Sequence, residues 1–346
     1  MNIGLLTGGG DCPGLNAVIR AVVRTALKRN HTVTGIRNGY KGMLEDDAET
    51  LTRDHVRGII YRGGTILGTS RTNPYKEPEG ETRILDFLTR RAIDALITVG
   101  GEDTLGVAAR LHASGVKVIG VPKTIDNDLE GTDFTFGFDT AVNIAMEAID
   151  RLHTTAESHN RIMVVEVMGR HAGWIALYAG IAGGADVILV PEHPFDIEAV
   201  CRKLQARHDS GQNFSIVVVA EGAKYETEGD VDGTLVVRSM EQDAFGHVRL
   251  GGIGSVLAAE IEHRLGYETR STVLGHIQRG GSPTAFDRML GTRFGIHAMD
   301  LVETGRFGRM VSLNGNRVVD VDIAVAEGRV RYLDPDLYRL AEMFCE

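Results

Sequence analysis

Residues 3–11 read Ile-Gly-Leu-Leu-Thr-Gly-Gly-Gly-Asp, so an apolar run ends in three consecutive glycines and an acid. A helical pattern follows, because the apolar residues between Leu15 and Ala26 share one helix face. The same order recurs at 95–112, where an apolar run leads into two glycines and a second helical pattern. Repeated strand, glycine turn and helix are typical of a mostly parallel sheet covered by helices. The sequence therefore predicts an α/β fold.

Further apolar runs and helical patterns continue this alternation toward the C-terminus. We expect strands at 116–121, 162–167, 187–190, 214–220 and 272–274, and helices at 139–158, 172–181, 197–209, 254–265 and 283–304. The chain has 346 residues, which exceeds the usual size of one domain. Because no long linker or low-complexity tract divides it, we expect two domains that are wound together.

Charge and cysteine content narrow the class of protein. The net charge of −10 argues against a general nucleic-acid surface. No apolar run approaches the roughly 18 residues that a membrane span needs. The three cysteines, Cys12, Cys201 and Cys345, are widely spaced and suggest neither a disulfide framework nor a zinc site. We therefore expect a cytoplasmic protein with no nucleic-acid and no membrane partner.

Both glycine turns follow strands, which is where ligands bind in open α/β sheets. Residues 8–10 precede a helix, so backbone N–H groups and the positive helix end can converge on an anion there. A merely tight turn fits the same residues. The second turn, 100–104, adds Glu102 and Asp103, which would repel a phosphate unless a metal ion lies between. Mg²⁺ is held in this way, so Glu102 is a predicted Mg²⁺ ligand unless both acids only cap the helix.

Residues 122–128 read Pro-Lys-Thr-Ile-Asp-Asn-Asp and bring a lysine, a hydroxyl and two acids together after an apolar strand. Spacing by two in an extended chain would point Asp126 and Asp128 to the same side. One carboxylate can accept the proton of a sugar hydroxyl and the other can contact a metal, while Lys123 offsets charge on a transferring phosphoryl group. An Asx-rich turn is the alternative interpretation.

These segments together resemble the phosphofructokinase family. They occur in the family's order and spacing over nearly the whole chain: Gly8-Gly9-Gly10-Asp11, Gly100-Gly101-Glu102, residues 122–128, Met168-Gly169-Arg170 and Gly-His-Ile-Gln-Arg-Gly-Gly at 275–281. The pattern from Arg270 through 275–281 to Asp287-Arg288 is a specific family signature. The resemblance implies two intertwined three-layer αβα domains with mostly parallel sheets. Residues 1–137 plus about 277–305 would form the phosphoryl-donor domain, and 138–276 plus about 306–346 the fructose 6-phosphate domain.

The resemblance also implies phosphoryl transfer to the 1-hydroxyl of fructose 6-phosphate, a step of glycolysis that uses Mg²⁺. Asp126 resembles the general base, and Thr124 and Arg170 resemble further catalytic residues. Members that use ATP usually carry glycine where this chain has Asp103 and Lys123. The Asp103 carboxylate would fill the space of an ATP α-phosphate, and Lys123 would contact the shorter pyrophosphate. The chain is therefore similar to the pyrophosphate-dependent members. Many relatives carry aspartate where this chain has Glu102.

Two other functions remain open at this point. An ATP-dependent phosphofructokinase is the nearer alternative, and a non-catalytic sugar-phosphate sensor is the more remote one. A nicotinamide dehydrogenase is disfavoured because the dinucleotide fingerprint is absent from the sequence.

The remaining site residues are implied by the resemblance. Pyrophosphate would contact Gly9, Gly10, Arg71, Asp103 and Lys123. Fructose 6-phosphate would contact Thr124, Ile125, Asp126, Asp128, Met168, Gly169, Arg170, Glu221, His276, Ile277, Gln278 and Arg279. Arg161 and Arg270 would reach across from a neighbouring subunit, which implies a homodimer or homotetramer with shared active sites. Arg20, Arg24 and Arg53 resemble effector-site arginines of regulated bacterial relatives.

Overall fold

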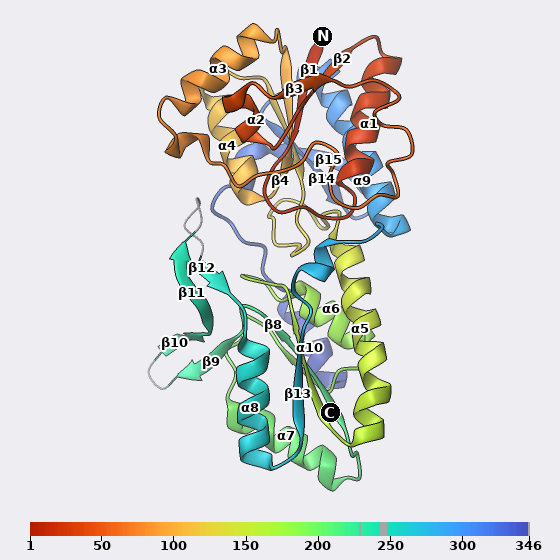
Figure 1. The fold of residues 1–346 in the computed structure, drawn as a ribbon, viewed down its shortest axis with the longest axis vertical. Helices are drawn as coiled ribbons and strands as arrows, with labels where there is room; N and C mark the ends of the chain where they lie inside the picture. The colour runs from red at the N-terminus through yellow and green to blue at the C-terminus, as the bar shows by residue number, and fades with distance from the viewer. Residues whose placement is uncertain (228–229, 243–247, 345–346) are drawn as a thin grey trace.

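The computed structural model describes residues 1–227, 230–242 and 248–344, which form two lobes (Figure 1). The chain enters the second lobe at Gly137, returns to the first lobe near residue 284, and leaves it again after Ala326. The lobes are therefore intertwined in sequence. None of the described helices combines the length and apolar character needed to cross a membrane. Cys12 and Cys201 are buried free thiols, and Cys345 lies outside the described residues.

The first lobe contains a seven-stranded sheet in the order β15-β14-β5-β4-β1-β2-β3. Its strands are β1 (Asn2–Thr7), β2 (Thr32–Ile36), β3 (Ala48–Thr50), β4 (Ala95–Gly100), β5 (Val118–Pro122), β14 (Arg309–Asn314) and β15 (Arg317–Asp322). The edge strands β3 and β15 run antiparallel to their neighbours, and the other pairs are parallel.

Helices cover both faces of this sheet because successive strand residues point to opposite sides. Leu5 packs in the same apolar cluster as residues of α1 (Leu15–Lys28) and α9 (Ala285–Glu303). Leu6, the next residue, packs in the cluster of the opposite face. That face is covered by α2 (Tyr40–Glu45), α3 (Gly80–Arg90) and α4 (Glu102–Ala113).

The second lobe is built on a four-stranded parallel sheet in the order β13-β6-β8-β7. Its strands are β6 (Ile162–Val167), β7 (Val187–Leu189), β8 (Ser215–Ala220) and β13 (Thr269–Val273). One face packs on α5 (Phe138–His159) and α6 (Trp174–Ala182), and the other on α7 (Ile197–Asp209) and α8 (Ile253–Leu265). The helix α10 (Pro335–Phe344) lies against α6. Two hairpins extend from one side, β9 (Lys224–Thr227) with β10 (Asp230–Leu235) and β11 (Val237–Gln242) with β12 (Val248–Leu250) (Figure 1).

The α/β fold class with mostly parallel sheets is confirmed, but one part of the expected domain division is wrong. We assigned residues 306–346 to the second domain. Strands β14 and β15 instead extend the first sheet, because β14 pairs in parallel with β5 and β15 pairs with β14. The first lobe therefore includes residues 309–322.

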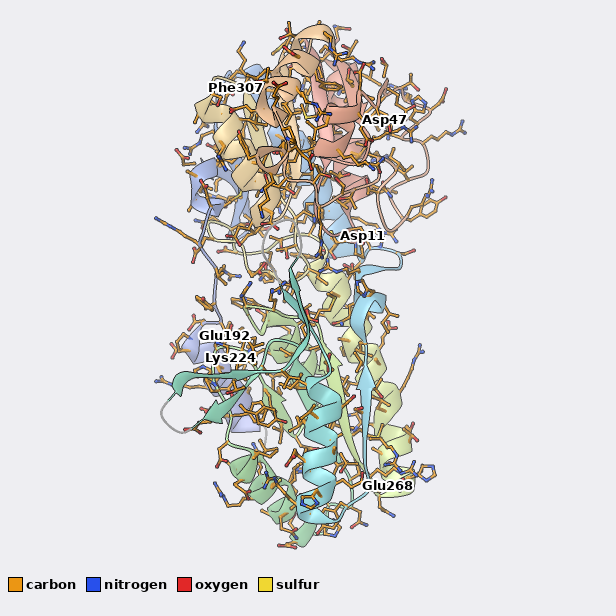
Figure 2. All side chains as sticks on the ribbon, turned by 60° about the vertical axis from the view of Figure 1, so that its left-hand side comes forward. Asp11, Asp47, Glu192, Lys224, Glu268 and Phe307 are labelled. Carbon is orange, nitrogen blue, oxygen red and sulfur yellow. The ribbon has the colours of Figure 1, made fainter. Side chains whose placement is uncertain are left out.

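The order of the strands explains where the two glycine turns meet. From β1 the chain crosses to β2 on one side, while β4 lies on the other side of β1. Connections that leave in opposite directions open a crevice at the carboxyl ends of the two strands. The turns after β1 and β4 both lie at this crevice, which faces the second lobe. Figure 2 shows Asp11, just beyond the β1 turn, at the junction of the lobes.

Asp287 links the two lobes from a fully buried position in the first turn of α9. Its Oδ2 accepts hydrogen bonds from the Thr140 N–H at 2.8 Å and the Thr140 hydroxyl at 2.5 Å. Burial raises the pKa of Asp287 to about 6, although the bonds from Thr140 and from the Gly137 backbone lower it. The Asp287 side chain, which belongs to a helix of the first lobe, thus accepts hydrogen bonds from the first turn of α5 in the second lobe.

Replacing Asp287 with alanine should lower the free energy of unfolding by about 2 kcal/mol or more at pH 5, because the buried donors of Thr140 lose their acceptor. The loss should be smaller at pH 8. A carboxyl group whose pKa is raised in the folded state stabilises the fold below its unfolded pKa, and this contribution declines as the pH rises through about 6. Urea titrations at both pH values measure the change. The exposed Asp86→Ala in α3 is the matched control, and an equal loss for both variants would contradict the prediction.

Candidate active site

A cleft with a cavity volume of about 190 Å³ lies between the lobes. It is bounded by segments that follow β1, β4 and β5 of the first lobe and β6 and β8 of the second. The lining residues are Gly9, Gly10, Arg71, Gly101, Glu102, Asp103, Thr104, Lys123, Thr124, Asp126, Asp128, Met168, Arg170, His171, Glu221 and Arg279. The structure therefore brings most of the predicted site residues together.

The turn after β1 brings two cations next to main-chain atoms. The Lys123 ammonium donates a hydrogen bond to the Gly10 carbonyl oxygen. A Cβ atom on Gly10 would lie only 2.7 Å from Nη1 of Arg279, so the absence of a side chain lets that guanidinium approach. Arg279 Nη1 also donates to the Asp11 carbonyl oxygen at 3.3 Å. Because Arg279 follows β13 of the second lobe, this contact joins the two lobes at the cleft.

The turn after β4 is packed against the β1 turn through Thr104, a cleft residue that no sequence motif indicates. Cβ atoms on Gly8 and Gly100 would lie 2.6 Å and 2.3 Å from the Thr104 side chain, so glycine is required at both. Glu102 and Asp103 occupy the first turn of α4 and line the cleft. Glu102 Oε1 accepts a hydrogen bond from the Gly328 N–H at 3.1 Å.

The turn that carries Asp126 and Asp128 differs from the extended chain that we expected. Asn127 has a φ of 54°, in the left-handed region. Its side-chain Oδ1 accepts a hydrogen bond from the Thr135 N–H at 3.0 Å, which holds the turn. Both carboxylates do line the cleft, but a turn rather than an alternating strand brings them there. The Asp126 Oδ1 atom is buried and has no hydrogen-bond partner among the described residues.

Burial dominates the acid–base properties of the cleft. It raises the pKa of Asp126, although Arg279, Lys123 and Arg170 oppose this effect. The pKa of Asp128 is raised to about 7 by burial and by the neighbouring Asp126 charge. Lys123 is only 3% exposed, and burial lowers its pKa to about 8. The cleft thus holds carboxylates that are stronger bases than usual beside an ammonium that is a stronger acid.

The second lobe contributes residues that follow its two central strands. Arg170 comes after β6 and Glu221 comes after β8, and these strands are direct neighbours. A Cβ atom on Gly222 would lie 2.0 Å from the Arg170 carbonyl oxygen, so glycine allows the two segments to pack together. Burial raises the pKa of Glu221 to about 7, and Asp126 and Glu166 add to the shift.

Several predicted contact residues do not line the cleft. Ile125 is fully buried in the main apolar cluster. Gln278 is also fully buried, and its Oε1 accepts a hydrogen bond from the Met168 N–H at 3.3 Å. Gly169 has a φ of 140° and allows the sharp bend before Arg170. The side chains of His276 and Ile277 are exposed outside the cleft. In the described conformation Ile125, Gly169 and Gln278 support cleft residues rather than forming the cleft wall.

Arg161 and Arg270 lie at the opposite end of the second lobe from the cleft. Arg161 precedes β6, whose length of six residues corresponds to about 20 Å, and Met168 follows it at the cleft end. Both guanidinium groups bind the Glu268 carboxylate, at 2.8 Å from Arg161 and 2.5 Å from Arg270. Figure 2 shows Glu268 near the far end of this lobe from Asp11. These arginines cannot reach the cleft of their own chain.

A separate basic recess of about 340 Å³ lies on the first lobe. Arg20, Arg24 and Arg53, three arginines that we singled out from the sequence, line it together with Arg57. The structure therefore groups residues that are up to 37 positions apart, and the recess shares no lining residue with the cleft.

Residues 2–302 match the family model described as phosphofructokinase. The chain belongs to the phosphofructokinase family. A relative from Streptomyces coelicolor, named pyrophosphate–fructose 6-phosphate 1-phosphotransferase, is 58% identical over 346 residues and both chains are covered to 99%. A relative from Mycobacterium tuberculosis, named ATP-dependent 6-phosphofructokinase, is 51% identical and also covered to 99% on both sides. The crystal structure of pyrophosphate-dependent phosphofructokinase from Nitrosospira multiformis has a TM-score of 0.83 over 96% of this chain and 86% of that chain. At 23% identity it shows a shared fold.

The carboxylates of this phosphofructokinase suit a metal ion that arrives with a phosphate ligand. Within the described residues, no group of three or more His, Cys, Asp or Glu side chains is arranged to hold a metal by itself. Mg²⁺ commonly takes one or two carboxylates and completes its shell with phosphate oxygens and water. Glu102 lines the cleft, and its charge adds to the raised pKa of Asp128, so these two carboxylates lie near each other. This donor set fits such a shared site.

The Lys123 ammonium should titrate near pH 8, against about 10.5 for an exposed lysine. The sign follows from burial, which disfavours the charged form, so the folded protein releases this proton at lower pH than an unfolded chain does. NMR of the lysine Cε and Nζ resonances measures the midpoint, and loss of one resonance in Lys123→Met assigns it. The exposed Lys41 provides the internal control. A Lys123 midpoint near 10 would show that the amine is not desolvated as described.

Proposed function

We propose that this chain is a pyrophosphate-dependent phosphofructokinase. It transfers a phosphoryl group from pyrophosphate to the 1-hydroxyl of fructose 6-phosphate, giving fructose 1,6-bisphosphate and phosphate. The observation that carries this proposal is that Asp103 and Lys123 both line the interlobe cleft. The Streptomyces coelicolor relative, which is 58% identical to this chain, is named for pyrophosphate, and its name supports the same phosphoryl donor. Glycolysis and a cytoplasmic location are parts of the proposal, in keeping with the phosphorylated substrates.

The choice of donor rests on charge and space at the first turn of α4. A carboxylate at Asp103 repels a third phosphate group and occupies volume that glycine would leave open. The Lys123 ammonium, held on the Gly10 carbonyl, supplies a fixed positive charge for a short diphosphate. Transfer from ATP is the second candidate, because the Mycobacterium tuberculosis relative at 51% identity carries that name.

In the proposed reaction, Asp126 acts as the general base. Its buried carboxylate accepts the proton of the sugar 1-hydroxyl as that oxygen bonds to the nearer phosphorus of pyrophosphate. The bond from this phosphorus to the bridging oxygen breaks, and phosphate leaves with the electron pair. Lys123 and Arg170 offset the negative charge that spreads over the transferring group. The Thr124 hydroxyl accepts from the Asp126 N–H at 3.1 Å and holds the carboxyl-bearing turn.

Mg²⁺ bound at Glu102 and the pyrophosphate oxygens would neutralise charge on the donor. Gly9, Gly10 and Arg71 complete the donor half of the cleft in this proposal, and Asp128, Met168, Glu221 and Arg279 form the sugar half. The donor half belongs to the first lobe, and the sugar half belongs to the second lobe except for Asp128. Transfer therefore takes place at the junction of the lobes.

The 6-phosphate end of the sugar is assigned to a second copy of the chain. By strand length Arg161 lies about 20 Å from its own cleft, and Arg270, which pairs with Met163 five residues before Met168, lies about 17 Å from it. Both can therefore complete only the cleft of a neighbour. Two arginines on one carboxylate form a cluster that matches the fork geometry of a phosphate group. We assign a homodimer or homotetramer with shared active sites on this basis, and His276 and Ile277 belong to the same proposed contact.

A donor panel tests the proposal. Purified protein should convert fructose 6-phosphate with pyrophosphate at least about a hundredfold better than with ATP, measured as kcat/KM. Asp103→Gly should raise the ratio of ATP use to pyrophosphate use by about tenfold or more, because a repulsive charge is removed. Asp103→Asn is the control that keeps the volume and removes the charge. Brisk turnover of the wild type with ATP and none with pyrophosphate would overturn the assignment.

Mixing two inactive variants tests the shared site. Asp126→Ala removes the base and Arg270→Ala removes a phosphate contact, so each protein alone should lose about a hundredfold or more in kcat/KM. In a mixed dimer one of the two clefts contains both native residues. Random exchange of subunits should therefore restore about a quarter of the wild-type activity. No recovery after subunit exchange, verified by mass spectrometry, would show that Arg270 acts within its own chain or not at all.

A further inference from the structure

Residues 328–333 form a strap that connects the lobes beside the catalytic turn. At one end the Gly328 N–H donates to Glu102 Oε1 in α4, at 3.1 Å. At the other end the Leu333 N–H donates to Glu192 Oε1 of the second lobe, also at 3.1 Å. The strap residues are not among those that line the cleft. They therefore act on the site through other residues.

Arg331 lies at the centre of the strap and makes contacts in both directions. Its N–H donates to the Asp128 carbonyl oxygen at 2.9 Å, and its guanidinium Nη1 donates to the Asn127 carbonyl oxygen at 3.3 Å. The guanidinium carbon lies 4.1 Å from the centre of the Trp174 ring in α6. The Trp174 Nε1–H in turn donates to the Arg331 carbonyl oxygen at 2.9 Å. Cation–π stacking and this hydrogen bond fix the arginine on the second lobe.

The turn that Arg331 holds is one that the backbone does not favour. Asn127 is left-handed, a conformation that residues with a Cβ atom adopt at a cost, although asparagine tolerates it better than most. Its side chain is held by the Thr135 N–H, and its carbonyl oxygen is held by Arg331. The peptide between the Asp126 and Asp128 carboxylates is thus fixed from both sides. Small changes in this peptide would move the base relative to the reacting hydroxyl.

We propose that Arg331 is a positioning residue, which holds the Asp126–Asp128 turn in its reactive arrangement and anchors it on Trp174 of the other lobe. The inference rests on the proposed function only in that Asp126 is the base. The side chain of Arg331 can be tested by itself, because Arg331→Ala leaves in place the main-chain groups that bond to Asp128 and Trp174. The variant therefore removes one interaction, the charged hydrogen bond from the Arg331 guanidinium to the Asn127 carbonyl oxygen.

Arg331→Ala tests the proposal by steady-state kinetics with each substrate varied. The kcat should fall about tenfold, the effect of one lost charge-assisted hydrogen bond, while both KM values stay within about twofold because Arg331 does not line the cleft. Guanidinium chloride at tens of millimolar should restore a large part of kcat relative to equal sodium chloride. Arg331→Lys, which keeps the charge without the planar fork, should lie between alanine and wild type. Arg329→Ala, an exposed arginine two residues away, is the matched control and should leave kcat unchanged.

Three outcomes would overturn the proposal: a kcat for Arg331→Ala within twofold of wild type, a change confined to KM, or a fall in kcat with a lower Tm that guanidinium does not reverse. The last outcome would assign Arg331 to fold stability alone. The wild type is assayed with both pyrophosphate and ATP, and the variants with the donor that it uses. Failure of the proposed donor is thereby separated from failure of the role proposed for Arg331.

Discussion

The buried ammonium of Lys123 is the interaction on which the cleft depends. It ties the end of β5 to the turn after β1 through the Gly10 carbonyl, and it lies next to Arg279 from the second lobe. Burial lowers the pKa of Lys123 to about 8, although Cys12, Asp11 and Asp126 oppose this effect, so the charged ammonium carries a desolvation penalty. An incoming phosphate anion removes this penalty, because it supplies the counter-charge that burial took away. Above pH 8 we therefore expect phosphate binding to be accompanied by proton uptake at Lys123.

The acids at the start of α4 act in the opposite direction. Glu102 and Asp103 complement the positive end of their own helix, so the fold tolerates both. For a phosphorylated ligand they are repulsive unless a cation accompanies it. A cleft with a fixed ammonium on one side and fixed carboxylates on the other therefore favours a compact anion that carries its own metal ion. A longer phosphate chain would have to extend past Asp103.

Much of the site was predictable because its residues follow strands in a repeated local pattern. Lys123 and Asp126 stand out as charged residues at the end of an apolar run, and the strand order then brings them to the β1 turn. What the sequence did not reveal depends on distant contacts. Thr104 is a site residue because it fills the space above two glycines that lie 92 positions apart, Gly8 and Gly100. Arg331 reaches Asn127 across 204 positions, so no local pattern indicates the contact.

The sequence contains signals for two features that we did not predict, the β14–β15 hairpin and the turn at Asn127. Gly315-Asn316 is a typical two-residue hairpin loop between alternating segments, and it predicts the β14–β15 hairpin that we did not identify. The hairpin alone does not say which sheet it joins, since the pairing of β14 with β5 is a tertiary contact. Asn127 is a residue type that tolerates positive φ, which already argued against an extended chain between the two aspartates.

The arginine pair at the far end of the second lobe is compatible with a site that is completed on assembly. In the single chain Glu268 neutralises both Arg161 and Arg270, so the fold keeps two cations close together without strong mutual repulsion. These ion pairs are partly exposed and therefore weak, at most about 1 kcal/mol each. A phosphate dianion offers more acceptor oxygens than one carboxylate and can displace Glu268 from the forks at little cost. The Glu268 carboxylate therefore holds the two arginines together in the free chain without preventing them from binding a phosphate.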